Sequence, residues 1–412
     1  LVLWSTLTLV TLVLVGAATV RYVVLPNVGD YREQIAAAIS RAANQQVRIG
    51  AVSGEWDGLR PRLALRAVQV FDSGGGERLA LASVDAQLSW TSLLALEPRF
   101  RSIRLERLSF EVRRDTAGRF WVAGMPFQHG DAGGGFGDWL LEQGGVGVYD
   151  STLTWVDETL GGEPLVVRDT DLQVQKRLGT WHFAVRARPP EAVAAPIDLR
   201  GELSRDRRGS GARWSGQLYF SVGYADLAAL RRWVAVPVDV RQGAGSVEAW
   251  LRIDAGQMRD LTTDVALSEV RLRLRAGLPV LALSRMAGRL NWQQNGLATT
   301  VAARQLSFTT PDGLRLAPAD ITYARSGPEG ARDTRSTVQF DRLDVAAVMR
   351  LLDRLPLDVA LRERLSQAGP SGTLRDFELR WVGPFREQRG YLLRAQFDRL
   401  GLYPTGYLPG FA

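Results

Sequence analysis

The chain has 412 residues, of which 46% are hydrophobic and 23% are charged; these fractions are typical of folded proteins and exclude a disordered chain. It contains no cysteine, so disulfides, thiolate nucleophiles and cysteine-based metal sites are excluded. The net charge of +7 favours an anionic partner, which leaves phospholipid head groups and nucleic acid open.

The chain begins with an uncharged apolar segment. Residues 1–20 read LVLWSTLTLVTLVLVGAATV, and as a helix they would extend about 30 Å, enough to cross a bilayer. A secretory signal peptide is the alternative, but its apolar region usually spans about 7–15 residues. Arg21 and Tyr22 follow, a basic and an aromatic residue of the kind found at membrane interfaces. We therefore expect a retained transmembrane anchor over residues 1–25.

A short amphipathic helix is expected next, over residues 26–46. Tyr31, Ile35, Ile39 and Ala42 recur at helical spacing and form one apolar stripe. The stripe is narrow and rich in alanine. We therefore expect this linker helix to pack against the first strands rather than lie on the membrane.

Residues 47–412 are dominated by a period of two, which is typical of strands with one apolar face. In VRLRLRA, at 270–276, apolar side chains alternate with arginines. Similar stretches are separated by Gly, Asp-Gly and Pro turns, and only residues 226–233 and 344–366 read as later helices. The sequence therefore predicts a mostly β fold: a transmembrane helix, then a long twisted antiparallel sheet with a few short helices.

The sequence offers little for catalysis. His129 and His182 lie in no metal or relay motif, and the glycine runs lack nucleotide-binding spacing. Asp157 and Glu158 are adjacent on a predicted strand, so they would point to opposite faces, which is poor geometry for acid–base chemistry. The arginines are interleaved along strands rather than gathered in a basic patch, which disfavours nucleic acid. We therefore expect a protein that is not an enzyme and has no cofactor or metal.

What covers the apolar strand faces decides the function. In a sandwich or barrel they would face each other as an ordinary core. Few helices are predicted to cover so long a sheet, however, and it begins beside a membrane. The alternative is an open apolar groove that shields acyl chains from water. The residues expected to line such a groove share an apolar, inward position on a predicted strand: Leu108, Phe110, Val112, Val247, Leu251, Ile253, Val270, Leu272, Leu274, Phe377, Leu379, Trp381, Leu393 and Phe397.

Several stretches resemble the AsmA-like superfamily of Gram-negative envelope proteins, and specifically its YhdP branch. They are the apolar N-terminus leading into VRIGAVSGEWDGLRPRLALRAVQV, then DSTLTWVDE, YADLAALRRWVAVPVDVRQGAGSVEAWLRI, LPLDVALRERLSQAGPSGTLRDFELRWVG and FDRLGLYPTGYLPGF. Together they span nearly the whole chain in a fixed order. Family members are longer, so the resemblance implies that residues 47–412 are the membrane-proximal part of an extended β-groove.

The resemblance implies a single-pass anchor in the inner membrane and a body in the periplasm. It implies a bridge-like lipid transfer protein that carries phospholipid between the inner and outer membranes and supports outer-membrane integrity. It carries over no catalytic residues. The alternative is an envelope assembly scaffold whose sheet binds outer-membrane protein clients, with exposed strand edges as its physical basis. An outer-membrane or envelope protein is the partner expected at the distal end.

Overall fold

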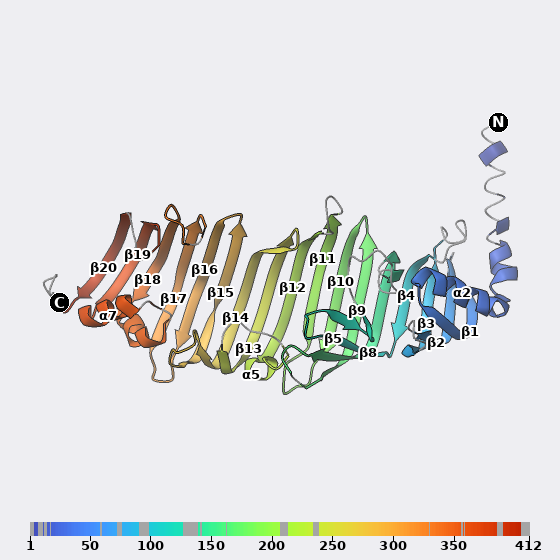
Figure 1. The fold of residues 1–412 in the computed structure, drawn as a ribbon, viewed down its shortest axis with the longest axis horizontal. Helices are drawn as coiled ribbons and strands as arrows, with labels where there is room; N and C mark the ends of the chain where they lie inside the picture. The colour runs from blue at the N-terminus through green and yellow to red at the C-terminus, as the bar shows by residue number, and fades with distance from the viewer. Residues whose placement is uncertain are drawn as a thin grey trace. The chain divides into compact units, whose positions relative to one another are not determined.

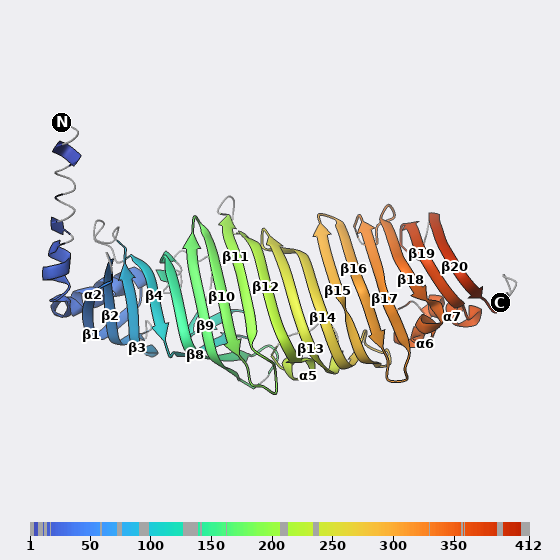
Figure 2. The same cartoon turned by 180° about the vertical axis from the view of Figure 1, so that it is seen from behind.

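The structure is a computed structural model, and it is mostly β with a few short helices (Figures 1 and 2). Two compact units divide the chain: the first holds residues 1–190 and 200–212, and the second holds residues 191–199 and 213–412. The residues that the structure describes are 4–6, 11, 15–16, 18–57, 60–71, 76–89, 99–126, 139–140, 142–161, 163–206, 213–233, 239–328, 330–355, 357, 359–384 and 390–404.

The first unit is built on a mixed sheet. Strands β1 to β4 pair antiparallel in chain order, β4 and β5 both pair parallel with β8, and β8, β9 and β10 continue antiparallel. The boundary between the units falls within β11. The strands are β1 (Gln46–Asp57), β2 (Arg60–Phe71), β3 (Glu77–Leu88), β4 (Phe100–Glu106), β5 (Ser109–Arg114), β6 (Phe120–Val122), β7 (Met125–Pro126), β8 (Gly145–Asp157), β9 (Leu165–Arg177), β10 (Thr180–Arg188) and β11 (Ile197–Asp206).

The prediction of an antiparallel sheet was wrong at one place. Ile103 of β4 pairs with Val146 of β8, and Phe110 of β5 pairs with Leu153 of β8, both in parallel register. Parallel neighbours need a long crossover rather than a tight turn. Here β6, β7 and the chain up to residue 144 supply it, an excursion that period-two alternation does not encode.

Short helical segments precede the first strand: η1 (Val20–Val24), η2 (Val28–Tyr31) and α2 (Arg32–Ala43). Helix α2 ends at Asn44, whose left-handed backbone (φ 50°) turns the chain into β1. Of the predicted anchor, residues 1–3, 7–10, 12–14 and 17 lie outside the described residues. Among the residues that are described, no helix is long and apolar enough to cross a membrane.

The second unit is an antiparallel meander in chain order from β12 to β20, as the sequence predicts. Asp226 and Asp344 each end a strand and cap the following helix through backbone N–H groups. The elements are β12 (Arg213–Asp226), α5 (Leu227–Leu230), β13 (Asp239–Asp254), β14 (Gln257–Arg273), β15 (Leu281–Asn295), β16 (Ala298–Thr309), β17 (Arg315–Ser326), β18 (Arg335–Asp344), α6 (Val345–Arg350), η3 (Leu352–Arg354), α7 (Val359–Ala368), β19 (Ser371–Val382) and β20 (Gly390–Gly401).

Left-handed residues interrupt the alternation of several strands. Ala67 in β2 has φ 50°, and Leu65 and Val68 on either side of it are both buried in the same apolar cluster although they are three residues apart. Glu269 in β14 has the same φ, and Leu267 and Val270 again share a cluster. An extra residue in a strand reverses which positions face the core. A strict period of two therefore holds only between these points.

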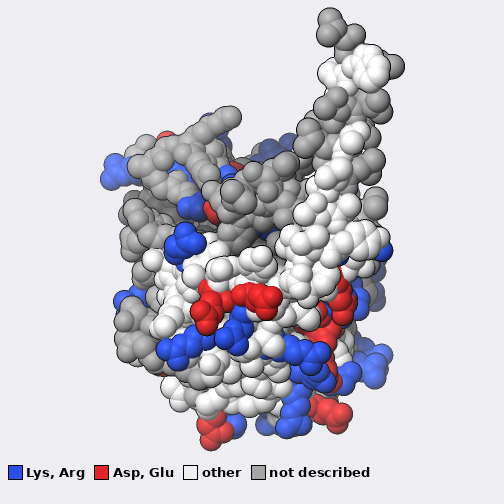
Figure 3. All heavy atoms as spheres, turned by 90° about the vertical axis from the view of Figure 1, so that its right-hand side faces the viewer, with Lys and Arg blue, Asp and Glu red and all other residues white. Residues whose placement is uncertain are grey.

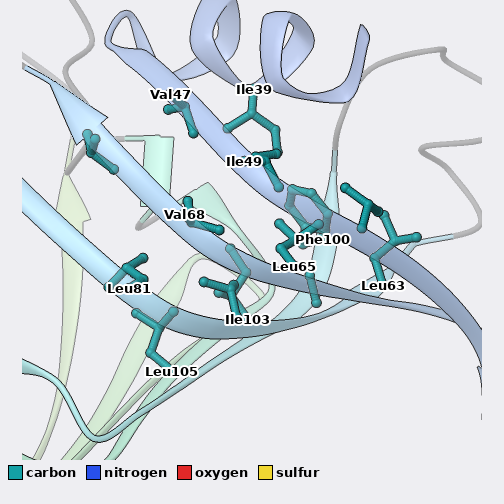
Figure 4. Packing of buried hydrophobic residues seen from close by; sticks show 14 of the residues in the cluster. Ile39, Val47, Ile49, Leu63, Leu65, Val68, Leu81, Phe100, Ile103 and Leu105 are labelled. Carbon is teal, nitrogen blue, oxygen red and sulfur yellow. The ribbon is translucent and has the colours of Figure 1, made fainter. Parts of the chain in front are cut away.

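Each unit has its own apolar cluster. The larger one lies in the first unit, between α2 and the strands β1 to β4 (Figure 4). The smaller one lies in the second unit, where Val270, Leu281 and Leu283 pack with Ala347 and Leu351 at α6. The apolar strand faces thus point toward helices at these two places.

Candidate functional site

The apolar face of the first unit is built from rows of paired side chains. Leu65 pairs with Val84, Val84 with Leu105, Leu105 with Val148, and Val148 with Leu172. Directly opposed residues share one face of a sheet, so these five side chains form one continuous row. A second row runs parallel to it through the residues Leu63, Ala86, Ile103, Val146 and Val174.

All members of these rows except Leu63 line one side of an apolar cavity of about 400 Å³. Every lining side chain is apolar, and the lining comes from α2, β1 to β6, β8, β9 and residues 108, 123, 139 and 140. Protein interiors contain few voids larger than a water molecule. Water finds few polar partners at such a wall, so an apolar pocket favours apolar ligands. The volume lies within the roughly 300–1,000 Å³ of small-molecule sites.

The cavity is roofed by elements from distant parts of the chain. Helix α2 and the segment β5 to β6 lie on the same side of the sheet in both views (Figures 1 and 2). Ile39 of α2 points toward the strands, close to Ile49 (Figure 4). Trp139 closes another side and meets Phe100 edge-on, with 6.1 Å between ring centroids. The apolar face of this unit is therefore partly covered, and the space beneath the covering elements is not filled.

The turn between β5 and β6 is held by Asp115. Its carboxylate accepts hydrogen bonds from the backbone N–H and Nε of Arg119, both at 2.8 Å, and from Nε1 of Trp121 at 3.1 Å. Burial raises the pKa of this carboxyl, but these hydrogen bonds and the charge of Arg119 outweigh it and lower the pKa to about 2. The turn fixes Val112 against Val122, two side chains that line the cavity.

The segment before α2 is packed onto β1. Leu25 and Val28 are buried in the same cluster as the cavity floor, and a Cβ on Gly54 of β1 would lie only 2.6 Å from Cδ2 of Leu25. The guanidinium of Arg21 lies over the ring of Trp56, 5.7 Å from its centroid. Figure 3 shows this end of the molecule, where basic and acidic side chains are both present and neither sign forms a single field.

Three of the residues predicted to line a groove lie together in this cavity. Leu108, Phe110 and Val112 all contribute to its wall, at the start of the segment that roofs it. Leu108 is buried, while Phe110 and Val112 are half-buried. The structure thus assembles this predicted strand with α2 and β9, from which it is distant in sequence.

The remaining predicted residues lie in the second unit. Val270 is 1% exposed in the smaller cluster, and Leu272 and Leu274 pack against that cluster. On β13, Val247 pairs with Val222 and Val265, Leu251 with Leu218 and Leu261, and Ile253 with Gly216 and Met258. These pairings place them on a shared apolar face.

At the C-terminal end of the second unit the predicted residues lie on β19 and β20 and contact apolar residues of β17 and β18. Phe377 stacks on Phe340 with 4.3 Å between centroids, Trp381 stacks with Tyr323, and Leu379 pairs with Val338 and Leu393. Leu393 and Phe397 of β20 are 56% and 64% exposed. The apolar face of this unit is therefore covered in part by α6, while Leu393 and Phe397 on the same unit contact solvent.

Much of the cavity wall consists of residues that were not predicted to line a groove. Ile103, Leu105, Val146, Val148, Leu172 and Val174 were not among the predicted residues. Their alternation was visible in GVGV at 145–148 and in LQV at 172–174. The prediction that the helix carrying Ile39 packs against the first strands is confirmed, whereas no sequence signal placed Trp139 over them.

The polar residues singled out for chemistry have structural roles. Asp157 accepts hydrogen bonds from the backbone N–H and the hydroxyl of Thr159, and Glu158 pairs with Arg113 at 2.8 Å. His182 is half-exposed and lies 3.8 Å from Glu202, while His129 lies outside the described residues. Within the described part of the chain no cluster of three His, Asp or Glu side chains is placed to hold a metal.

Comparison with known proteins gives one result. A family model described as YhdP protein matches residues 1–412, the full length of the sequence. Searches of curated proteins and of solved structures found no match. The family match agrees with the resemblance carried by the motifs from VRIGAVSGEWDGLRPRLALRAVQV to FDRLGLYPTGYLPGF, and the chain belongs to the YhdP family.

Proposed function

We propose that this protein is a bridge-like lipid transfer protein that carries phospholipids with their acyl chains on its apolar strand faces. The observation that carries the proposal is the partly covered cavity of about 400 Å³, which is lined by apolar and aromatic residues. Membership of the YhdP family fits a lipid-transport role. We further propose that residues 1–25 anchor the chain in the inner membrane, so that the sheet crosses the periplasm toward the outer membrane.

The energetics favour an acyl chain as the occupant. Each methylene moved from water into an apolar site contributes about 0.8 kcal/mol, so a long chain gains far more than a small polar ligand would. A polar ligand would also lose most of its hydrogen bonds to water without replacement, because the wall is lined by aliphatic and aromatic side chains. The head group must therefore stay outside the apolar wall.

The second unit supports the same function with a more open face. Val301 pairs with Trp292 and Tyr323, which places it in an apolar row, yet it is 44% exposed. Exposed apolar rows of this kind are costly in a soluble protein and usually mark a binding surface. In the proposed function, acyl chains cover them during passage.

The test is photo-crosslinking from the cavity wall. Phe110 is replaced by the aromatic photocrosslinker p-benzoylphenylalanine, and the same crosslinker at Glu111 serves as the control, because Glu111 is exposed on the other face of β5. After irradiation in cells, mass spectrometry of the purified protein should show phospholipid adducts at 110 and none at 111. A folded protein that crosslinks at 110 only to its own chain would show that the cavity is a packing void, and the proposal would fail.

The alternative function is an assembly scaffold that binds protein clients. The observation in its favour is β20, where Tyr391, Leu393 and Phe397 are large, apolar and exposed. An exposed apolar strand of this kind can pair with a strand of another protein. Crosslinks from position 397 to an outer-membrane protein, together with a lipid-free position 110, would favour the scaffold over transfer.

A further inference from the structure

Lys176 is the one lysine among the 51 basic residues of the chain, and on β9 it lies beside the second apolar row, which includes Val174. On β9, Leu172 and Val174 line the cavity, and Lys176 is the next residue on the same face. Val174 pairs with Val146 and Phe183, and Lys176 pairs with Trp181. Two residues along a strand span about 7 Å, so the backbone of Lys176 lies about 7 Å beyond that of Val174, a lining residue.

Lys176 packs on an aromatic ring rather than on a carboxylate. Its Nζ lies 4.6 Å from the centroid of the Trp181 ring, and both side chains are half-buried. Among the residues that the structure describes, no carboxylate lies within ion-pair distance of Nζ. On other strands, Arg289 pairs with Asp264 at 2.6 Å and Arg113 with Glu158 at 2.8 Å. Lys176 therefore presents a positive charge that no described carboxylate neutralises.

The residue beside Lys176 on the adjacent chain segment is a glycine, Gly144. The backbone N–H of Lys176 donates to the carbonyl of Gly144, which has no side chain to cover the ammonium. A Cβ at position 144 would lie 2.6 Å from the carbonyl oxygen of Arg101, so a larger residue does not fit there without a backbone shift. The ring of Trp181 lies on the opposite side.

We propose that Lys176 binds the phosphate of a lipid whose acyl chains occupy the cavity; this inference rests on the proposed function. An amphipathic lipid needs a cation or donor at the point where its apolar binding wall ends, because its phosphate cannot enter the wall. A lysine ammonium on a flexible stem binds phosphate as a point charge. The lipid class selected here is therefore one with a phosphate head group rather than a neutral glyceride.

The experiment compares two lipids that differ only in the phosphate. The detergent-purified full chain is stripped of lipid and offered phosphatidylglycerol and diacylglycerol with identical acyl chains, and binding of each is measured by native mass spectrometry. The variants are Lys176→Met, which keeps the stem without the charge, and Lys176→Arg, which keeps the charge. Arg177→Met is the matched control, because Arg177 lies on the opposite face and donates to Gln175 at 2.8 Å.

The parent protein, Lys176→Arg and Arg177→Met should all prefer phosphatidylglycerol, and Lys176→Met should lose about tenfold of that preference. Lys176→Met should bind diacylglycerol as the parent does and should have the same melting temperature as the parent. An unchanged preference in a folded Lys176→Met protein would show that Lys176 only packs on Trp181, and would overturn the inference while leaving the proposed function intact. Failure of the parent to bind either lipid would instead overturn the proposed function.

A further arm separates the lipid head group from free phosphate. Inorganic phosphate is added to the stripped parent and to Lys176→Met without lipid. No phosphate adduct should form on either protein at concentrations at which phosphatidylglycerol binds the parent. A phosphate adduct on the parent that disappears in Lys176→Met would assign the site to the free ion and overturn the lipid assignment.

Discussion

Ala86 provides a test of the cavity at the scale of a single residue. It is buried on β3 and lines the cavity, so the longer side chain of Ala86→Leu would extend into the void. We expect this variant to be as stable as the parent, or more stable by up to about 2 kcal/mol, since the added methylenes become buried. Lipid occupancy should fall. Chemical denaturation and native mass spectrometry measure the two effects.

The result is informative because a filled core would respond in the opposite direction. Inserting methylenes into a well-packed interior costs about 1–3 kcal/mol. Ala80→Leu on the same strand is the control, because Ala80 is exposed on the other face and its replacement should change stability by no more than about 0.5 kcal/mol. A destabilised Ala86→Leu protein beside an unchanged control would mean that the cavity does not exist in solution.

Asp115 should make the stability of the turn between β5 and β6 depend on pH. Its pKa in the folded protein is about 2, below the ordinary 3.8, so the folded state favours the ionised form. The stabilisation is therefore complete well above pH 3.8 and is lost as the pH falls toward 2. In Asp115→Asn an amide N–H₂ replaces one acceptor, next to donors from Arg119 and Trp121. We expect Asp115→Asn to have a lower melting temperature than the parent at pH 7. The difference between the two melting temperatures should narrow between pH 4 and 2. A constant difference across this range would contradict the assignment.

At the scale of elements, the contact between Leu25, which precedes α2, and β1 should stabilise the position of α2 over the cavity. A Cβ at Gly54 would lie 2.6 Å from Cδ2 and 2.8 Å from the backbone oxygen of Leu25, so the backbone must shift. Gly54→Ala should cost about 1–3 kcal/mol and speed hydrogen exchange across residues 25–43. At Gly29 the nearest atom to a Cβ is the Val52 carbonyl oxygen at 3.6 Å, so Gly29→Ala serves as the control. Equal exchange in both variants would show that this contact does not hold α2.

The elements also show what the sequence can and cannot predict. The strands of the second unit were predictable, because antiparallel neighbours joined by short turns carry their pattern in consecutive residues. The parallel pairing of β4 and β5 with β8 was not, since alternation is the same for either direction. The shifts at Ala67 and Glu269 were also hidden, because both residue types usually avoid the left-handed region.

The candidate site was predictable only in part for a related reason. Leu108, Phe110 and Val112 were visible as one face of a strand, and the cavity indeed uses that face. The cavity depends on which other elements meet that strand, however, and Ile39 and Trp139 reach it across long stretches of sequence. The sequence shows that an apolar face exists, while only the tertiary structure shows whether it is packed, covered or exposed.

At the scale of the whole molecule, the two units differ in how much of their apolar strand face is covered. In the first unit α2 and β5 cover it, whereas in the second unit Val301, Leu393 and Phe397 remain exposed. On the polar face, ion pairs such as Arg304 with Asp320, at 2.9 Å, match charge with charge. We expect the apolar rows of both units to contact lipid during transfer. A charge introduced into an apolar row should then stop lipid transfer, whereas a charge on the polar face should not.

Val301 is the position where this expectation can be tested without unfolding the protein. It is 44% exposed, so the carboxylate of Val301→Glu can be hydrated, yet it stands in the row of Trp292 and Tyr323 along which acyl chains would move. Thr300→Glu, on the opposite face beside Gln293 and Ala324, is the control. We expect at least about tenfold slower transfer of a fluorescent phospholipid between vesicles for Val301→Glu, equivalent to about 1.4 kcal/mol at the barrier, and parental rates for the control. Parental transfer by a folded Val301→Glu protein would restrict the lipid path to the first unit, because a path over this row requires an acyl chain to pass a fixed negative charge.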